Sequence, residues 1–318
     1  MATLREERDF DLREIMRRLT WDALSMQAVG KVFIEPEEDR YNEFWTIVGE
    51  GDRRLKSRLG MPRLSDPFQL AFARWAGTFG DLVNRARLAP REGAVDLLSV
   101  ALSRGTRLSD RDLALEIGNV WFGGQMGIAS LLVTSLYLLE RNPRVRARVQ
   151  EELKDRLGAE GAYSMDRLES CAWLDGVVRE AHRLLPAVPL FFRNANQFEA
   201  VELGGYELAP NTEILISNFG LHRDRDHWAH PEHFVPERWH DPAIRAANRY
   251  GSGFFFPYGR GERSCAGSAV AVHTIKMILA SFLRETGLQI ADLFCFEEDF
   301  FATVLSYRWL RARLTEPA

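Results

Sequence analysis

The stretch Phe256-Pro257-Tyr258-Gly259-Arg260-Gly261-Glu262-Arg263-Ser264-Cys265-Ala266-Gly267 runs directly into an apolar segment that predicts a helix from about Ser268 to Arg284, capped by Gly287. The unpaired N–H groups at a helix N-terminus favour a thiolate at Cys265, and Arg263 adds a full positive charge. Glycines 259, 261 and 267 would let the backbone approach a flat, bulky ligand. The stretch therefore predicts a loop that presents one sulfur ligand to a large metal cofactor. The alternative is an inert buried cysteine that packs as a small hydrophobic side chain.

Composition and charge limit the class of protein. The chain has 318 residues, 46% hydrophobic and 27% charged, which is ordinary for a globular protein. Its net charge of -4 argues against a nucleic-acid partner. Its three cysteines, Cys171, Cys265 and Cys295, form no C-x-x-C pair and follow no secretory leader, which predicts a reducing, cytoplasmic location. Uninterrupted apolar runs fall short of the ~18 residues of a membrane span, so we expect no membrane attachment through this chain.

Hydrophobic periodicity predicts a mainly helical chain. Ser109 is a predicted N-cap for a long apolar helix that ends at Arg141, before Asn142-Pro143. Pro143 then opens a polar helix to Leu157, whose alternating charges predict a solvated face. Further helices are predicted at 11–29, 41–59, 68–88 and 173–185, and short extended runs between residues 191 and 218 predict a small sheet.

The pattern Tyr258-x-x-Gly261-x-Arg263-x-Cys265-x-Gly267 resembles the haem-binding loop of the cytochrome P450 haem-thiolate monooxygenases, with Tyr where that family usually has Phe. The resemblance implies one P450-like domain over residues 1–318, mainly α with a small β-sheet portion. Its central helix would be about 110–141, and its haem-binding loop and following helix about 254–286. It also implies haem b (iron protoporphyrin IX), with Cys265 as the axial ligand of the iron. The remaining loop positions expected to bind the haem are Tyr258, Gly259, Gly261, Arg263 and Gly267.

Two further segments are similar to signatures of the same family. Glu180 and Arg183 stand three apart on a predicted helix, as in the family's Glu-x-x-Arg element. Pro236-Glu237-Arg238-Trp239 is similar to its Pro-Glu-Arg-Phe element. The resemblance implies that Arg238 completes a buried network with the helix pair and so fixes the loop that carries Cys265. It also assigns Arg193 and Arg263 to the haem propionates, although both could be ordinary surface arginines.

Four histidines between residues 222 and 233 raise a zinc alternative. Their spacings of five, three and three, without a nearby Cys, do not match a standard zinc pattern. The resemblance explains this segment better, as the family's usual lead-in to its arginine-bearing element.

The match begins in the middle of the family fold. The family's first helices, part of its first sheet and the segment over the substrate pocket have no counterpart here. We expect a start codon assigned too late, a gene fragment or a split protein.

The predicted central helix also departs from the family pattern. Ungapped alignment places Gly123-Gly124 on the family's pair of small residues, and Met126 and Gly127 on its usual acid and alcohol. Neither Met126 nor Gly127 can carry a proton on its side chain. We expect Gly124 and Gly127 to lie beside the reacting centre, with Gln125 or Ser130 ordering a water there. A shifted register would instead make Ser130 the alcohol.

The resemblance implies an oxidoreductase that inserts one oxygen atom from O2 into a small apolar substrate, with electrons from a ferredoxin-type or flavin-type protein docking on the cysteine side. The missing acid and alcohol leave a second hypothesis open. A haem-thiolate isomerase, dehydratase or peroxygenase needs no protons delivered to bound dioxygen. A third hypothesis is an inactive, truncated haem-binding remnant.

Overall fold

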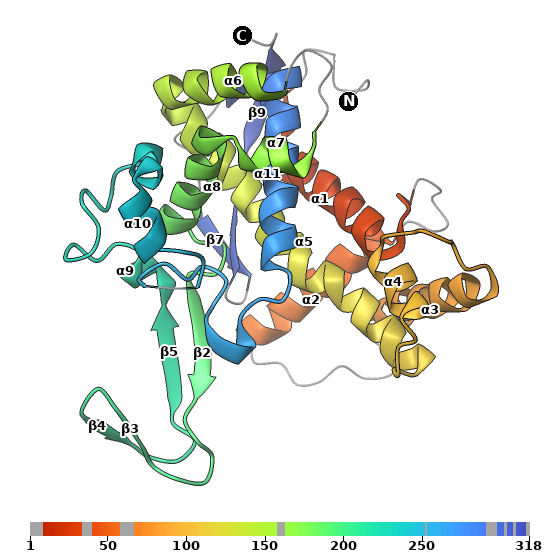
Figure 1. Cartoon of the computed structure of the whole chain (residues 1–318). Coiled ribbons are helices and arrows are strands. Elements are labelled where there is room, and N and C mark those ends of the chain that lie inside the picture. Colours follow the sequence, from red (N-terminus) through yellow and green to blue (C-terminus); the bar gives the residue numbers. More distant parts are fainter. Residues whose placement is uncertain are drawn as a thin grey trace. The chain divides into compact units, whose positions relative to one another are not determined.

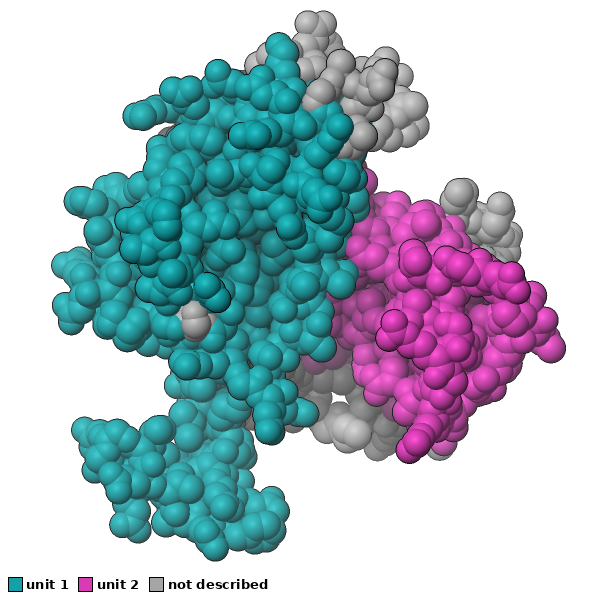
Figure 2. Space-filling view, viewed as in Figure 1, with its two compact units in different colours: residues 1–13, 130–318 teal, residues 14–129 magenta. Residues whose placement is uncertain are grey.

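The computed structural model describes residues 9–33, 40–57, 67–157, 163–251, 253–290, 298–301, 304–307 and 310–315. The chain divides into two compact units, which Figure 2 colours separately. Unit 1 comprises Met1–Arg13 and Ser130–Ala318, and unit 2 comprises Glu14–Ala129. The organisation as a single domain stays a prediction.

Helices make up unit 2. They are α1 (Leu12–Val29), α2 (Tyr41–Ser57), α3 (Pro67–Leu88), α4 (Leu97–Ser103) and the first part of α5 (Asp110–Arg141). Inside the unit, Trp121 lies 5.7 Å from Trp21 and 4.9 Å from Phe79, measured between ring centroids. Trp75 packs edge-on against Phe122 at 4.8 Å. Large aromatic side chains therefore form a contiguous cluster inside this core.

The long helix α5 begins and ends where the sequence predicts. Asp112 N donates to Ser109 Oγ at 3.1 Å, and the Ser109 hydroxyl donates to the Asp112 carboxylate at 2.6 Å, so a free N–H of the first turn is satisfied. By length and apolar composition α5 could cross a membrane, but 72% of its most apolar window is buried within the protein. A buried core helix passes the same test.

Unit 1 holds the remaining helices, which Figure 1 labels in chain order. The first of them, α6 (Pro143–Leu157), buries Val145, Val149 and Leu153 at spacings of four and exposes most of its charged residues, although Arg146 is half-buried and pairs with Glu140. The predicted solvated face is thus confirmed for Arg144, Arg148, Lys154 and Arg156 but not for Arg146. After α5 come α6 (Pro143–Leu157), α7 (Met165–Glu169), α8 (Ala172–Leu184), α9 (Asn218–Leu221), α10 (Pro242–Ala247) and α11 (Ser268–Glu285), with 3-10 turns η2 (Pro236–His240) and η3 (Gly261–Arg263).

The prediction that Gly287 caps the last helix is wrong. The residue after α11 is Thr286, which is extended (φ -135°, ψ 139°) and whose hydroxyl donates to Phe282 O at 2.6 Å. Gly287 is instead the first residue of β6 (Gly287–Ile290), opposite Thr315 of β9 (Arg311–Thr315). The chain passes directly from helix to strand because pairing with β9 begins at Gly287.

The prediction of one small sheet between residues 191 and 218 is also corrected. Strand β2 (Leu190–Asn194) pairs with β5 (Glu213–Ser217), whereas among the described strands β3 (Val201–Leu203) pairs only with β4 (Tyr206–Leu208). The Gly204-Gly205 turn has positive φ at both residues, as a tight two-residue hairpin requires, so β3 and β4 pair with each other. Figure 1 shows this hairpin beyond the far end of the β2–β5 ladder. The other described ladders are β1 (Phe10–Asp11) with β9 and β6, and β7 (Glu298–Phe301) with β8 (Val304–Tyr307).

Candidate functional site

The glycine-rich loop before α11 folds back on itself and leaves its cysteine exposed. Cys265 N donates to Tyr258 O at 2.8 Å, and Ser264 N donates to Gly261 O at 3.0 Å. Gly259 (φ 74°) and Gly261 (φ 77°) occupy the left-handed region, which glycine adopts without steric penalty. Residues 260–267 are all exposed. The backbone therefore holds Cys265 just before the first turn of α11, with its sulfur accessible.

The entry to this loop is held by side chains at α9. Phe256 N donates to Nε2 of His222 at 3.3 Å, and the Asn218 amide donates to Phe256 O at 3.4 Å. Both His222 and Asn218 are buried. Because Nε2 of His222 accepts a hydrogen bond, its imidazole is neutral here.

An aromatic cluster lies behind the loop. Tyr258 packs edge-on against His182, with ring centroids 4.9 Å apart, and against Tyr250 at 5.4 Å. The hydroxyls of Tyr258 and Tyr250 are buried and have no hydrogen-bond partner among the described residues. Burial, with the nearby Tyr250, holds the pKa of Tyr258 well above its usual range. Tyr258 is therefore a neutral phenol whose buried hydroxyl makes no hydrogen bond with the described residues.

We expect Tyr258→Phe to raise the free energy of unfolding by about 1 kcal/mol, because it removes a buried, unpaired hydroxyl while keeping the ring. Urea unfolding would measure the change. Tyr41→Phe is the matched control, since the Tyr41 hydroxyl donates to Glu14 at 2.6 Å and its loss should destabilise the protein. Destabilisation by Tyr258→Phe would show that its hydroxyl does have a partner.

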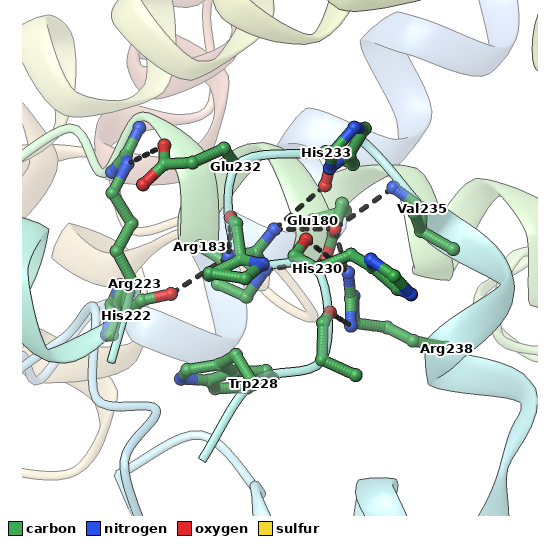
Figure 3. A network of polar contacts seen from close by, with 12 residues as sticks. Glu180, Arg183, His222, Arg223, Trp228, His230, Glu232, His233, Val235 and Arg238 are labelled. Carbon is green, nitrogen blue, oxygen red and sulfur yellow. Dashed lines mark hydrogen bonds and ion pairs between the residues drawn. The ribbon is translucent and has the colours of Figure 1, made fainter. Parts of the chain in front are cut away.

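The structure brings Glu180, Arg183 and Arg238 together (Figure 3). Arg183 binds Glu180 through two parallel bonds, from Nη2 at 2.8 Å and from Nε at 3.0 Å. Arg238 Nε donates to the same carboxylate at 3.0 Å. The side chains of Glu180 and Arg183 are completely buried. Two arginines from different elements therefore neutralise one buried carboxylate.

Every side-chain polar atom of Glu180 and Arg183 makes at least one hydrogen bond. Glu180 accepts from Val235 N at 3.1 Å and from the Trp239 indole at 2.9 Å. Arg183 donates to three carbonyl oxygens, those of His222 (2.9 Å), Pro231 (2.6 Å) and His233 (3.0 Å). The histidine-rich segment thus supplies backbone acceptors to the network, which fixes η2 against α8. The role of Trp239 was not predicted, although a tryptophan directly after Arg238 was the available signal.

A second ionic cluster, which the sequence analysis also missed, centres on Asp175 of α8. Its carboxylate lies 2.6 Å from Lys276 Nζ, 2.8 Å from Arg179 Nε and 3.0 Å from Arg245 Nη2. Burial alone would raise the pKa of Asp175, but the Lys276 and Arg179 cations outweigh it and hold that pKa below its usual range. The cluster joins α8, α10 and α11. Its one sequence signal was Lys276, a lysine inside the apolar run of α11.

We expect the protein to lose stability as the pH falls below about 6.5, the usual pKa of histidine. Burial lowers the pKa of both His182 and His222 to about 3. In the unfolded chain these imidazoles take up protons near their usual pKa. The unfolded state therefore binds more protons than the folded state, and a lower pH stabilises it relative to the folded state. Each histidine should remove up to ~1.4 kcal/mol of stability per pH unit below that value.

Urea unfolding at about pH 7 and about pH 5.5 would measure this loss. His182→Asn should make the dependence roughly half as steep, whereas His230→Asn, at an exposed position, should leave it unchanged. Equal slopes in the native protein and in His182→Asn would contradict the assignment.

Within unit 2, the two predicted glycines of α5 lie in different surroundings. A Cβ on Gly124 would meet Leu24 Cδ2 at 2.9 Å, so close packing of α1 on α5 accounts for this glycine. At Gly127 no atom lies within 4 Å of the Cβ position. The amide nitrogen of the buried Gln125 donates to Arg17 O at 2.6 Å, whereas its amide oxygen has no partner among the described residues, so the water that we expect Gln125 to order stays a prediction. In unit 1, Ser130 is buried and its hydroxyl has no partner among the described residues.

The comparisons with known proteins agree on one family. A family model described as Cytochrome P450 matches residues 81–294. Cytochrome P450 4V2 of Mus musculus is 36% identical over 190 residues, which cover 59% of this chain and 35% of that protein. Beta-amyrin 24-hydroxylase of Glycine max is 33% identical over 183 residues, covering 56% of this chain and 35% of that protein. The chain therefore aligns with about a third of the length of these curated relatives.

The fold also resembles that of a cytochrome P450 whose structure has been solved. The crystal structure of the cytochrome P450DA heme domain matches with a TM-score of 0.85 and 21% identity, covering 99% of this chain and 70% of that one. The fold is thus that of a P450 heme domain, of which this chain represents a part. With the family model matching most of the chain, the protein belongs to the cytochrome P450 family.

Membership of the family implies a haem, and the cysteine loop fits that group. Cys265 offers one accessible sulfur, and the Cβ position of Gly261 has no atom within 4 Å. Haem iron in this family needs one thiolate from the protein, whereas a structural zinc site needs four ligands. Among the described residues, His, Cys, Asp and Glu form no group of three or more that could hold a metal ion. The donor set therefore suits a haem better than a bare metal ion.

The remaining predicted positions are placed as follows. Arg263 is exposed within η3, and Gly267 is the residue before α11. Arg193 is half-buried in β2, where its guanidinium donates to Phe192 O at 2.8 Å and lies over the ring of Phe191. The propionate roles of Arg193 and Arg263 stay predictions. Cys295 lies outside the described residues.

Proposed function

We propose that this chain is the cysteine-bearing part of a monooxygenase that inserts one oxygen atom from O2 into a small apolar substrate. The observation that carries the proposal is the exposed Cys265, held by its bond to Tyr258 O at the start of α11. The name of one relative, beta-amyrin 24-hydroxylase, describes an oxygen insertion and supports the same reaction type. The cofactor we propose is haem b.

The chain's own residues have distinct tasks in this proposal. A thiolate-bound haem supplies the activation of dioxygen. Cys265 supplies the sulfur, and the loop hydrogen bonds keep it in place. Arg193 and Arg263 supply positive charge for the two propionates. Glu180, Arg183 and Arg238 act as positioning residues, because they hold the elements packed behind the loop.

We infer that the electrons come from a separate ferredoxin-type or flavin-type protein. The charged, exposed face of α6, with Arg144, Arg148 and Lys154, supports an electrostatic match with such a donor. A cytoplasmic location, without a nucleic-acid partner or membrane attachment through this chain, belongs to the same proposal.

A second candidate is a peroxide-using or O2-independent haem-thiolate enzyme, such as an isomerase or dehydratase. Specific support comes from α5, where Met126 and Gly127 offer no side-chain group that could pass a proton to oxygen. These reactions do not require that proton delivery.

Turnover assays separate the candidates. The haem-loaded chain is supplied either with dioxygen, a reductase and NADPH, or with hydrogen peroxide alone, and apolar substrates are followed by mass spectrometry. Incorporation of one ¹⁸O atom from ¹⁸O2 is the result we expect. Products formed only with peroxide would select the second candidate. Failure to retain haem through purification would favour an inactive remnant over both.

A further inference from the structure

An open recess of about 360 Å³ lies in unit 1, and none of the residues assigned to the haem lines it. Its walls come from α8, from α10 and from the residues that follow α10. Figure 1 shows these two helices near each other. The lining residues are Arg179, Pro242, Arg245, Ala246 and Arg249. Three of the five are arginines, so this recess is strongly basic.

Asp175, beside the recess, contacts more positive charges than it can neutralise. Arg179, Arg245 and Lys276 all contact this one carboxylate, at 2.8, 3.0 and 2.6 Å. Three positive charges against one negative charge leave an excess of two. Arg249 adds a further guanidinium to the lining. A cluster of this kind favours an anion with about two negative charges.

Arg179 provides an independent sign of a missing partner. Its side chain is only 13% exposed, and its Nη1 atom is buried with no hydrogen-bond partner among the described residues. Its guanidinium lies 4.3 Å from the ring centroid of Tyr250, so it is fixed by stacking as well as by Asp175. Buried donors are nearly always satisfied by protein, water or an ion. The guanidinium of Arg179 is therefore a fixed positive charge beside a basic recess, which favours the binding of an anion there.

We propose that the recess lined by Arg179, Arg245 and Arg249 is a binding site for a phosphate monoester or a diphosphate. Guanidinium groups bind phosphate oxygens through paired hydrogen bonds, which ammonium groups cannot do. A phosphate monoester carries about -1.5 to -2 charges at neutral pH, close to the excess of two around Asp175. The cavity has room for more than the phosphoryl group itself, since ligand sites begin at about 300 Å³.

Isothermal titration calorimetry of the full haem-loaded chain with pyrophosphate, and separately with inorganic phosphate, tests this site at constant ionic strength. We expect saturable binding with a stoichiometry of one. Arg245→Gln and Arg249→Gln should each weaken pyrophosphate binding by about tenfold or more. Arg225→Gln removes an exposed arginine that does not line the cavity, so it should leave the affinity unchanged.

A cooperative thermal transition would show that each variant is folded. Saturating pyrophosphate should raise the melting temperature of the native chain but not the melting temperature of Arg245→Gln. The readout is binding, so the result does not depend on turnover. Absence of saturable binding, or an equal loss in Arg225→Gln, would overturn the proposal. It would also be overturned if pyrophosphate failed to bind while Arg245→Gln weakened binding of an acidic ferredoxin, because the arginines would then form a protein-docking surface.

Discussion

Replacement of Cys265 by serine should abolish thiolate ligation of the haem and, with it, the spectrum typical of a thiolate-bound iron. A serine hydroxyl stays protonated at neutral pH and is a poor replacement for a soft sulfur ligand. The fold should survive, because the Cys265 side chain is exposed and its backbone N–H still bonds to Tyr258 O. We expect haem titrations to show much weaker binding, and the reduced carbonyl complex to lose the thiolate signature.

Cys171→Ser is the matched control for this experiment. Cys171 is the other cysteine among the described residues, and its buried thiol contacts Arg167 O at 3.3 Å. Replacing this buried thiol should change stability by the small amount typical of a conservative core substitution and leave the haem spectrum unchanged. An unchanged spectrum in Cys265→Ser, or a lost one in Cys171→Ser, would remove Cys265 as the ligand.

Glu180→Gln should be the most destabilising single substitution among those discussed. It keeps the shape of the side chain but leaves the completely buried Arg183 without its counter-charge, and it weakens the bonds from Arg238 and Trp239. Breaking a buried ion pair in this way costs about 3–5 kcal/mol. Urea unfolding would show this as a large shift of the midpoint, or as a chain that does not fold.

The control for that loss is Glu151→Gln on α6. Glu151 pairs with Arg148 at 3.0 Å, and both side chains are more than half exposed. Exposed pairs contribute about 0–1 kcal/mol, so the variant should be nearly neutral. If Glu180→Gln were equally mild, the buried network would not stabilise the elements behind the loop.

Much of the helical framework could be predicted because its signals are local. Ser109 lies one turn from the N–H group that it caps, and Pro143 lies one residue after the break that ends α5. Glu180 and Arg183 share a helix face by spacing alone, whereas the addition of Arg238 required the resemblance to a known family. Local rules thus placed the elements, and the family pattern indicated which distant ones meet.

Contacts between distant residues explain most of what was missed. Nothing near Asp175 in the sequence points to Lys276, which lies on another helix, and the indole of Trp239 reaches Glu180 from η2. Gly287 is a glycine shortly after a helix, as is typical of a helix cap, but it pairs with Thr315 of β9. The amide nitrogen of Gln125 donates to Arg17 O, a contact between α5 and α1 that the sequence around Gln125 does not indicate.

The central claim is that the sulfur of Cys265 binds haem iron. Iron X-ray absorption of the ferric, haem-loaded chain tests it directly. We predict one sulfur atom in the first coordination shell of the iron, present in the native chain and in Cys171→Ser and absent from Cys265→Ser. A first shell of nitrogen and oxygen alone in the native chain would contradict the account.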